Sequence, residues 1–329
     1  MARTMARLRM GDLEKPYFVS YTARETRRTT LRCDFGGLVV SEENPDRGLK
    51  AEVRVGDASF DNTHYVGADS WRYRPFVGDL PLEDDYDALR ASLWSLTDEA
   101  YKASLKRLSQ KRAYKNTKAA LEELPDLSTD TAPRTFLPLA AEPFDRKAWE
   151  GRVCELSRVF RNFPAVQQSW VYLDVSVENR WFVDSQGGAY ARPAEDIELQ
   201  FGGSAQAADG METQQTRRQL FRSVSQLPPL PKLTQEVEAF AAELTGWTKA
   251  PVQAEYVGPV LFEGEGAAEF FNQLLAHNVS NPRSLWLENE SEKKRFPAGA
   301  LAGRIGLRVG PSFLDATDDP TPDQEDGTP

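Results

Sequence analysis

Histidine and cysteine are the scarcest reactive residues in this chain of 329 amino acids. Its only histidines are His64 and His277, too few for a metal site built on several imidazole ligands. Each is therefore expected to be an ordinary surface or hydrogen-bonded side chain. Its only cysteines, Cys33 and Cys154, lie far apart and in no CxxC arrangement. Two such cysteines predict a reducing compartment and no disulfide framework.

Long apolar runs are also missing. No segment approaches the roughly 20 apolar residues that a membrane helix needs, and the basic start MARTMARLRM lacks the apolar core of a secretion signal. The chain is therefore predicted to be cytoplasmic, with no membrane association. Its net charge of −10 opposes binding to nucleic acid. Basic clusters at 24–32 and 102–115 are interpreted as a strand surface and the solvated end of a helix.

Known catalytic and cofactor motifs are missing as well: the sequence holds no GxSxG, no P-loop and no HExxH. The stretch GEGAAE, residues 264–269, approaches the dinucleotide loop GxGxxG, but Glu269 takes the place of the third glycine. Glu263 and Glu265 would add further negative charge beside a pyrophosphate. From the residues alone we predict no catalytic residue, no cofactor-binding residue, no metal ligand and no cofactor.

Alternating apolar and polar residues fill the first part of the chain, residues 16–78. The alternation breaks at Gly36-Gly37 and then places one set of apolar residues on a single strand face: Leu49, Ala51, Val53 and Val55. This pattern predicts an antiparallel sheet covered on one side. A similar alternation over 169–201 predicts a β-hairpin and a third strand.

From Pro81 the apolar spacing changes to three and four residues, which predicts a long helix over 83–115. Its stripe of Leu89, Leu93 and Leu105 is expected to pack on the first sheet. The same reasoning places further helices beginning near Arg146, after a capping Thr234 and around Phe270, and short strands at 250–262 and 304–309.

Proline-rich stretches, 122–145 above all, suggest linkers between parts of the fold. We predict an α+β fold with mostly antiparallel sheets and long helices. Its expected parts are an N-terminal α/β domain (1–125), a middle segment with a β-hairpin (126–230), the start of a sheet-rich C-terminal domain (231–315) and a disordered acidic tail (316–329).

Five stretches together carry a resemblance to known proteins. They are RTTLRCDFGGLVVSEENPDRGLKAEVRVGD (28–57), LWSLTDEAYKASLKRLSQKRAY (93–114), RWFVDSQGGAY (180–190), AADGMETQ (207–214) and YVGPVLFEGEGAAEFFNQLLA (256–276). In this order they resemble the TldD/PmbA family, also called modulators of DNA gyrase, a group of predicted metallopeptidases. The resemblance spans nearly the whole chain.

The resemblance implies an N-terminal α/β portion, a middle segment and a sheet-rich C-terminal domain, with action on flexible peptides as a dimer. In the metal-binding branch of the family, the strand matching PVLF runs into HExxxH. The two histidines there bind zinc, the glutamate is the general base, and a cysteine near the far C-terminus is a third ligand. Histidines four residues apart share one helix face, which leaves an open position for an activated water.

This chain departs from that motif, because Glu263, Gly264 and Ala267 stand at the three positions and Glu265 is one place out of register. It resembles instead the PmbA branch, also called TldE, which lacks the motif and pairs with a TldD subunit. The family also continues beyond this chain's end, so the chain is interpreted as C-terminally truncated. The joint itself is expected to be a closely packed corner of small residues.

The sequence thus predicts a metal-less partner subunit of a peptidase that acts on unfolded peptides. Its expected partners are a second copy or a TldD-like subunit bearing HExxxH, together with peptide substrates. The alternative is a non-enzymatic remnant that binds peptides or a partner. An independent hydrolase is disfavoured, because every motif for known hydrolytic chemistry is missing.

Overall fold

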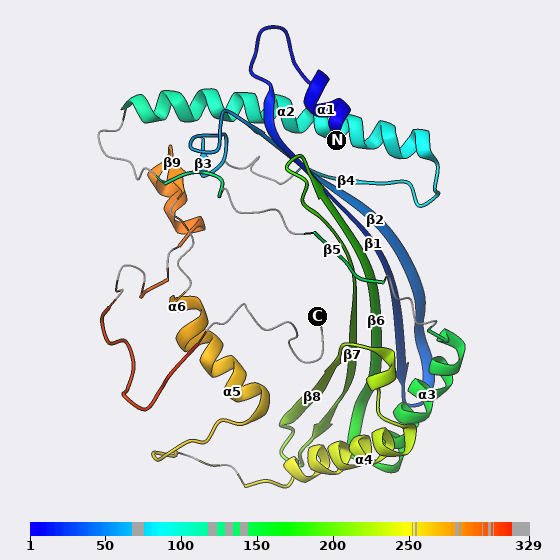
Figure 1. The fold of residues 1–329 in the computed structure, drawn as a ribbon. Helices are drawn as coiled ribbons and strands as arrows, with labels where there is room; N and C mark the ends of the chain where they lie inside the picture. The colour runs from blue at the N-terminus through cyan, green and yellow to red at the C-terminus, as the bar shows by residue number, and fades with distance from the viewer. Residues whose placement is uncertain are drawn as a thin grey trace.

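A long, curved sheet forms the body of the molecule in the computed structural model (Figure 1). The structure describes residues 1–67, 76–117, 124–128, 134–138, 144–251, 253, 255–279, 283, 285–297, 299–301, 304 and 306–317. The sheet is seven-stranded, in the order β4-β2-β1-β6-β7-β5, and β8 also pairs β7. Its strands are β1 (Pro16–Asp34), β2 (Gly37–Val55), β4 (Phe76–Asp79), β5 (Arg134–Phe136), β6 (Val166–Asp184), β7 (Ala189–Gln206) and β8 (Glu212–Phe221).

Two long hairpins supply most of this sheet. The β1–β2 hairpin turns through Phe35 and Gly36, which both have positive φ (47° and 82°), and β1 also pairs β6 antiparallel. The β6–β7 hairpin was expected, but the third strand predicted within 169–201 is wrong, since β6 and β7 are longer than the alternation suggested. The third strand is β8, further along the chain. Among the strands that the structure describes, β5 alone joins this sheet in parallel.

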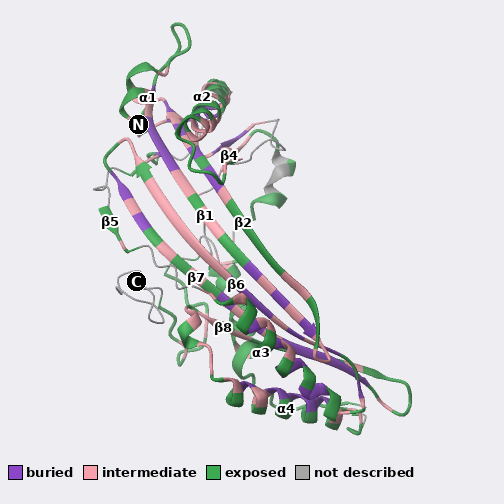
Figure 2. Ribbon diagram, turned by 90° about the vertical axis from the view of Figure 1, so that its right-hand side faces the viewer, coloured by how far each residue is buried: buried purple, intermediate pink, exposed green. Residues whose placement is uncertain are grey.

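Two separate cores lie on the same side of β1. Odd-numbered residues near its start pack under helix α2 (Tyr86–Thr117), and odd-numbered residues near its end pack under α3 (Arg146–Arg158). Figure 2 shows how burial varies along the sheet, and in β1 the buried residues lie toward both ends with intermediate or exposed ones in between. The first core contains Val19, Tyr21, Leu49, Ala51, Val53, Val55, Ala100, Tyr101 and Leu108.

The long helix predicted over 83–115 is confirmed as α2. Of the predicted stripe, Leu93 and Leu105 pack against the first core, whereas Leu89 lies outside it. The second core is closed by α3, the 3-10 helix η2 (Val159–Asn162) and α4 (Leu230–Trp247). The expected start of α4 at Thr234 is wrong. The helix begins four residues earlier, after Pro229, and the Thr234 hydroxyl donates to the Leu230 carbonyl inside the helix.

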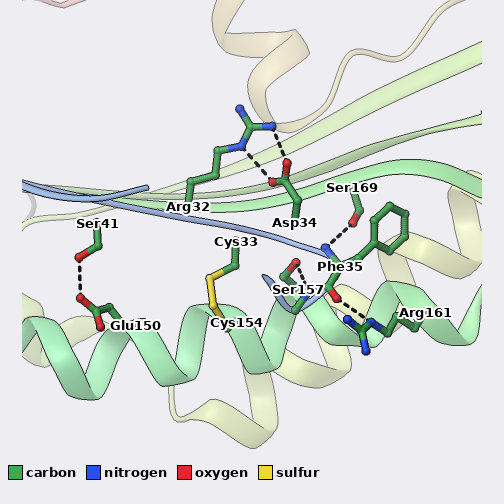
Figure 3. The surroundings of a disulfide bond; sticks show 11 residues. Arg32, Cys33, Asp34, Phe35, Ser41, Glu150, Cys154, Ser157, Arg161 and Ser169 are labelled. Atoms are coloured by element: carbon green, nitrogen blue, oxygen red, sulfur yellow. Dashed lines mark hydrogen bonds and ion pairs between the residues drawn. A yellow bond between two sulfur atoms is a disulfide. The ribbon is translucent and has the colours of Figure 1, made fainter. Parts of the chain in front are cut away.

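A disulfide joins Cys33 on β1 to Cys154 on α3, with a Cα–Cα distance of 5.0 Å (Figure 3). The prediction of no disulfide is therefore wrong. Cys33 is fully buried in the second core, and the helix that carries its partner lies 121 residues further along the chain. Spacing in the sequence could not reveal this contact, because only the packing of α3 on the sheet creates it. Disulfides are rare in cytosolic proteins, so the cysteines no longer support a reducing compartment.

The segments around the turn of the first hairpin are further tied to α3 and the residues after it. The Gly36 amide donates to Ser157 Oγ at 3.0 Å and Arg161 Nε donates to the Phe35 carbonyl at 2.6 Å (Figure 3). The Ser41 hydroxyl also donates to Glu150 at 2.5 Å. Together these contacts and the disulfide fix α3 on one end of the sheet.

The last third of the chain contains little regular structure among its described residues. A helix runs through α5 (Gly264–Phe271), the π-helical turn η4 (Asn272–Ala276) and α6 (His277–Val279), as the sequence predicted around Phe270. The predicted strands at 250–262 and 304–309 are wrong, since none of their described residues lies in a strand. A strand needs a neighbour for its backbone hydrogen bonds, and β9 (Trp286–Leu287) finds one instead, pairing in parallel with β3 (Tyr65–Val66).

The remaining elements are short: α1 (Ala2–Arg7), η3 (Val224–Gln226) and η5 (Glu290–Arg295). The expected α+β fold with mostly antiparallel strands is confirmed. The boundary expected at residue 125 falls inside one sheet, because β1 and β2 precede it and β6 and β7 follow it. Most of the predicted disordered tail, 318–329, lies outside the described residues. Within the described part of the chain, no helix is long and apolar enough to cross a membrane.

Candidate functional site

The joint that the sequence singled out, at the start of α5, does not fit a zinc ion. Glu263, Glu265 and Glu269 are all exposed, and no imidazole accompanies them at the positions of the family motif. Glu269 instead accepts a hydrogen bond from Gln273 Nε2 at 2.7 Å, which lowers the pKa of its carboxyl group. Zinc sites combine three or four imidazole, thiolate or carboxylate ligands. Within the described ranges, no three His, Cys, Asp or Glu side chains are grouped to hold a metal.

The joint is also not the closely packed corner that was expected, so that interpretation is wrong. A Cβ added to Gly264 or to Gly266 would meet nothing within 4 Å, and Gly264 itself has a positive φ of 54°. Gly264 therefore serves the turn into the helix, because glycine accepts positive φ without strain.

A buried polar cluster lies elsewhere, where α2 ends beside the loop after β2. We call it the Asp126 cluster. It comprises Arg54, Asp61, His64, Lys111, Asp126 and Arg283. These residues come from the end of β2, the loop 56–64, α2, the segment 124–128 and the segment before β9. No part of the sequence analysis brought them together.

Asp126 is the centre of this cluster and its side chain is only 2% exposed. One oxygen accepts from Lys111 Nζ at 2.5 Å and from the Asp61 amide at 2.8 Å. The other accepts from Arg283 Nη1 at 3.2 Å and lies 3.3 Å from His64 Nδ1. Burial alone raises the pKa of this carboxyl group, but the hydrogen bonds from His64 and Lys111 outweigh it and hold the pKa at about 2.

Lys111 is almost wholly buried, at 1% exposure of its side chain. Its ammonium donates to Asp126 and, at 2.8 Å, to the Thr63 carbonyl, and it lies 4.6 Å from the ring centre of Phe60 and 5.0 Å from that of Trp286. Burial lowers the pKa of Lys111, while Asp126 opposes that change. The ionised carboxylate and the two aromatic faces keep the ammonium charged.

Asp61 forms a second buried carboxylate in the cluster and is fully shielded from solvent. It accepts from Tyr17 Oη at 2.7 Å and from Arg54 Nη1 at 3.2 Å. Burial, followed by the hydrogen bond to Asp61, raises the pKa of Tyr17. Each buried charge therefore has a partner of opposite charge, as buried ions require.

His64 occupies a strained position at the edge of this cluster, since its φ of 56° is unusual for a residue with a side chain. Thr63 Oγ1 donates its single proton to Asp61 Oδ1, 2.6 Å away, and must therefore accept from His64 Nδ1 at 3.0 Å. Asp126 likewise offers Nδ1 only an acceptor. Arg283 Nη1 lies 3.4 Å from Nδ1, but its two protons are donated to the Pro125 carbonyl and to Asp126 Oδ1. The neutral ring accordingly carries its proton on Nδ1, and Nε2 keeps a free lone pair.

A cavity of about 440 Å³ opens beside His64 and the last residues of β2. Its lining comes from β2, the loop after it, α2 and the segment before β9. Among the lining side chains are Lys50, Glu52, Arg54, Asn62, His64, Ser104, Arg107 and Arg283. Perturbed groups gathered around a cavity mark a candidate functional site.

The sequence carried only weak signals of this site. His64 was expected to be an ordinary residue, and Asp126 fell in the segment interpreted as a linker. The polar run Asp61-Asn62-Thr63-His64 directly after a strand is the one feature that could have been followed further.

Acid should weaken the fold through Asp126. The pKa of its carboxyl group falls from an ordinary 3.8 to about 2 on folding, so its stabilisation is complete above about pH 4 and is lost as the pH falls through about 2. The expected loss is about 2 kcal/mol of unfolding free energy. Urea unfolding from about pH 5 to about pH 2 measures it. Asp126→Asn should lack this step, and an identical pH dependence in both proteins would contradict the assignment.

The arginines of the basic cluster at 24–32 lie along β1, and each pairs with a carboxylate. Arg24 lies 3.1 Å from Asp46, Arg27 3.5 Å from Glu43, Arg28 2.8 Å from Asp174 and Arg32 3.0 Å from Asp34. Asp174 is the most enclosed of these partners and also accepts from Thr30 and Tyr172. These pairs offset the positive charge of the strand. Lack of nucleic-acid binding stays a prediction.

No protein-family model and no curated protein matches the chain. Solved structures that match include TldE from Thermococcus kodakarensis, with 12% identity and a TM-score of 0.46 over 88% of this chain and 56% of that one. Two others are described as proposed modulators of DNA gyrase. The one from Thermotoga maritima has 12% identity and a TM-score of 0.42 over 70% of this chain and 45% of that one. The one from Bacteroides thetaiotaomicron has 9% identity and a TM-score of 0.42 over 68% and 45%.

TldE and modulator of DNA gyrase are names used for the TldD/PmbA family, which the sequence resembles. The chain spans about half the length of the solved structures it matches. At such identities and scores, the activity of those proteins does not carry over to this chain.

Proposed function

We propose that this chain is a metal-free subunit of the TldD/PmbA type, which pairs with a chain bearing HExxxH in a peptidase for unfolded peptides. The sequence resemblance supports the type. The joint at the start of α5 supports the lack of a metal, because its carboxylates are exposed and no imidazole lies among them. In this proposal zinc and its activated water belong to the partner subunit.

The observation that carries the proposal is an exposed apolar segment, residues 256–279. Nine large hydrophobic side chains in it are between 41% and 90% exposed: Tyr256, Val257, Val260, Leu261, Phe262, Phe270, Phe271, Leu274 and Val279. Phe262 stacks on Phe270 with ring centres 4.9 Å apart. Single exposed apolar residues are normal in soluble proteins, but so many within one segment are typical of an interaction surface. Aromatic residues are also enriched at protein interfaces.

Introducing charge into this segment should break the association. In Val257→Glu/Leu261→Glu, two carboxylates replace side chains that are 90% and 81% exposed, so the isolated chain should fold unchanged. We expect its affinity for the HExxxH-bearing subunit of the same genome to fall at least about tenfold, because a buried charge without a partner opposes binding. Light scattering on the mixed chains measures the complex.

Leu220→Glu is the matched control, since Leu220 is 71% exposed but lies on β8. It should bind the partner as tightly as the unchanged chain. A complex that tolerates both charges in the apolar segment would remove the basis of the proposal, as would two chains that never associate.

A second candidate is peptide binding without a partner subunit, and the edge of β8 favours it. β8 pairs β7 over its ten residues, and no strand within the described ranges pairs its other edge. Extended peptides add to such edges through backbone hydrogen bonds. Fluorescence anisotropy with a labelled unstructured peptide and the chain alone separates the two candidates. Binding without the partner subunit supports the second.

A further inference from the structure

The cavity beside His64 is lined by more positive than negative side chains. Four permanent cations line it, Lys50, Arg54, Arg107 and Arg283, against one carboxylate, Glu52. Arg54 is held by Glu52 at 2.6 Å and by Asp61, and Arg283 by Asp126. Lys50 is exposed on β2. Such a lining attracts a negatively charged group.

His64 adds a hydrogen-bond acceptor to the same cavity. Its Nδ1 proton is directed to Thr63 and Asp126, and all hydrogen bonds and ion pairs of the ring to described residues are made by Nδ1. A ring whose tautomer is held in this way can accept a hydrogen bond from a ligand at Nε2. The positive φ of His64 costs the fold free energy, and strained residues of this kind gather at ligand sites.

We propose that this cavity binds a small anion that carries a hydrogen-bond donor beside its charge. The carboxyl end of a peptide, with its neighbouring N–H, and a hydrogen phosphate, with its P–OH, both have this chemistry. Lys50 and Arg283 attract the anionic oxygens, and His64 Nε2 accepts from the donor. The volume of about 440 Å³ lies in the range of small-ligand pockets. This proposal is independent of the partner-subunit function.

The alternative is that the charged residues around the cavity have a structural role alone. Arg283 donates to the Leu124 and Pro125 carbonyls at 2.7 and 2.8 Å, and so fastens the segment before β9 to residues 124–128. That role needs no ligand and does not involve Lys50 or His64 Nε2. The experiment therefore tests the Lys50 ammonium and His64 Nε2.

Nuclear magnetic resonance of the imidazole rings gives a direct test, because the chain has only two histidines. The probes are inorganic phosphate, a short N-acetylated peptide with a free carboxyl end, and the same peptide with an amidated end. At millimolar concentration, we expect at least one of the two anions to shift the His64 ring signals saturably. The His277 signals should stay in place, and His64→Asn assigns the two sets.

Lys50→Met should weaken that binding about tenfold, the expected effect of losing one charged contact to an anion. Lys147→Met removes another exposed charge, from α3, and should leave the affinity unchanged. A response to phosphate alone identifies a phosphate site, and a response to the free peptide acid alone identifies a carboxylate site. The proposal is overturned if neither anion shifts His64, if the amide binds as well as the acid, or if Lys50→Met binds unchanged.

Discussion

Lys111→Met should lower the free energy of unfolding by about 3–5 kcal/mol, the cost of leaving one member of a buried ion pair alone. Asp126 would keep its shielded position, at 2% exposure, but lose its shortest contact, 2.5 Å from Lys111 Nζ. The Thr63 carbonyl would lose a donor as well. Methionine fits the space of the lysine stem, so the loss reports the charge and its hydrogen bonds rather than a cavity. Urea unfolding at neutral pH measures it.

Lys102→Met is the matched control on the same helix. Lys102 also pairs with an aspartate, Asp98, at 2.6 Å, but its side chain is 54% exposed. Its removal should cost less than about 1 kcal/mol, because solvent screens surface pairs. In the double variant Lys111→Met/Asp126→Asn no charge of the pair remains, and much of the lost stability should return. Equal effects of Lys111→Met and Lys102→Met would show that the buried pair has no special role.

Removing the disulfide should have an effect of similar size. In Cys33→Ala/Cys154→Ala the unfolded chain is no longer closed into a loop by the disulfide. The two cysteines are 121 residues apart in the sequence. The chain-entropy relation gives about 5 kcal/mol for a loop of that length, and measured losses are typically about 2–5 kcal/mol. Alanine adds no buried polar group at the fully buried position of Cys33. The comparison is the urea midpoint of the oxidised chain, the reduced chain and the double variant.

Reduction provides the control for that experiment. A thiol reductant should lower the midpoint of the unchanged chain toward that of the double variant, and it should leave the double variant unaffected. If the oxidised and reduced chains unfold at the same midpoint, the disulfide does not stabilise the fold. Mass spectrometry of the chain under native conditions then reports whether the bond forms in its own compartment.

The sequence by itself determined the elements whose signals are local. The helix α2 follows from apolar residues every three or four positions, and the hairpin of β1 and β2 follows from alternation broken at Gly36-Gly37. Such periodicities record which side of an element is covered, whatever covers it. The same rule failed for 250–262 and 304–309, where apolar residues suggested strands. A strand also needs a neighbour to pair with, and the sequence of one segment does not say whether it has one.

Only the tertiary structure decided which residues far apart in the sequence contact one another. Cys33 meets Cys154 because α3 packs on the end of the sheet, and Asp126 meets Lys111, His64 and Arg283 because four segments converge there. Burial then decides the chemistry, since a lysine and an aspartate that would be unremarkable in water become a strongly coupled pair once solvent is removed. Composition and spacing describe residues only within one local stretch of the sequence. The site depends on which neighbourhoods the fold brings together and on how far it excludes water from them.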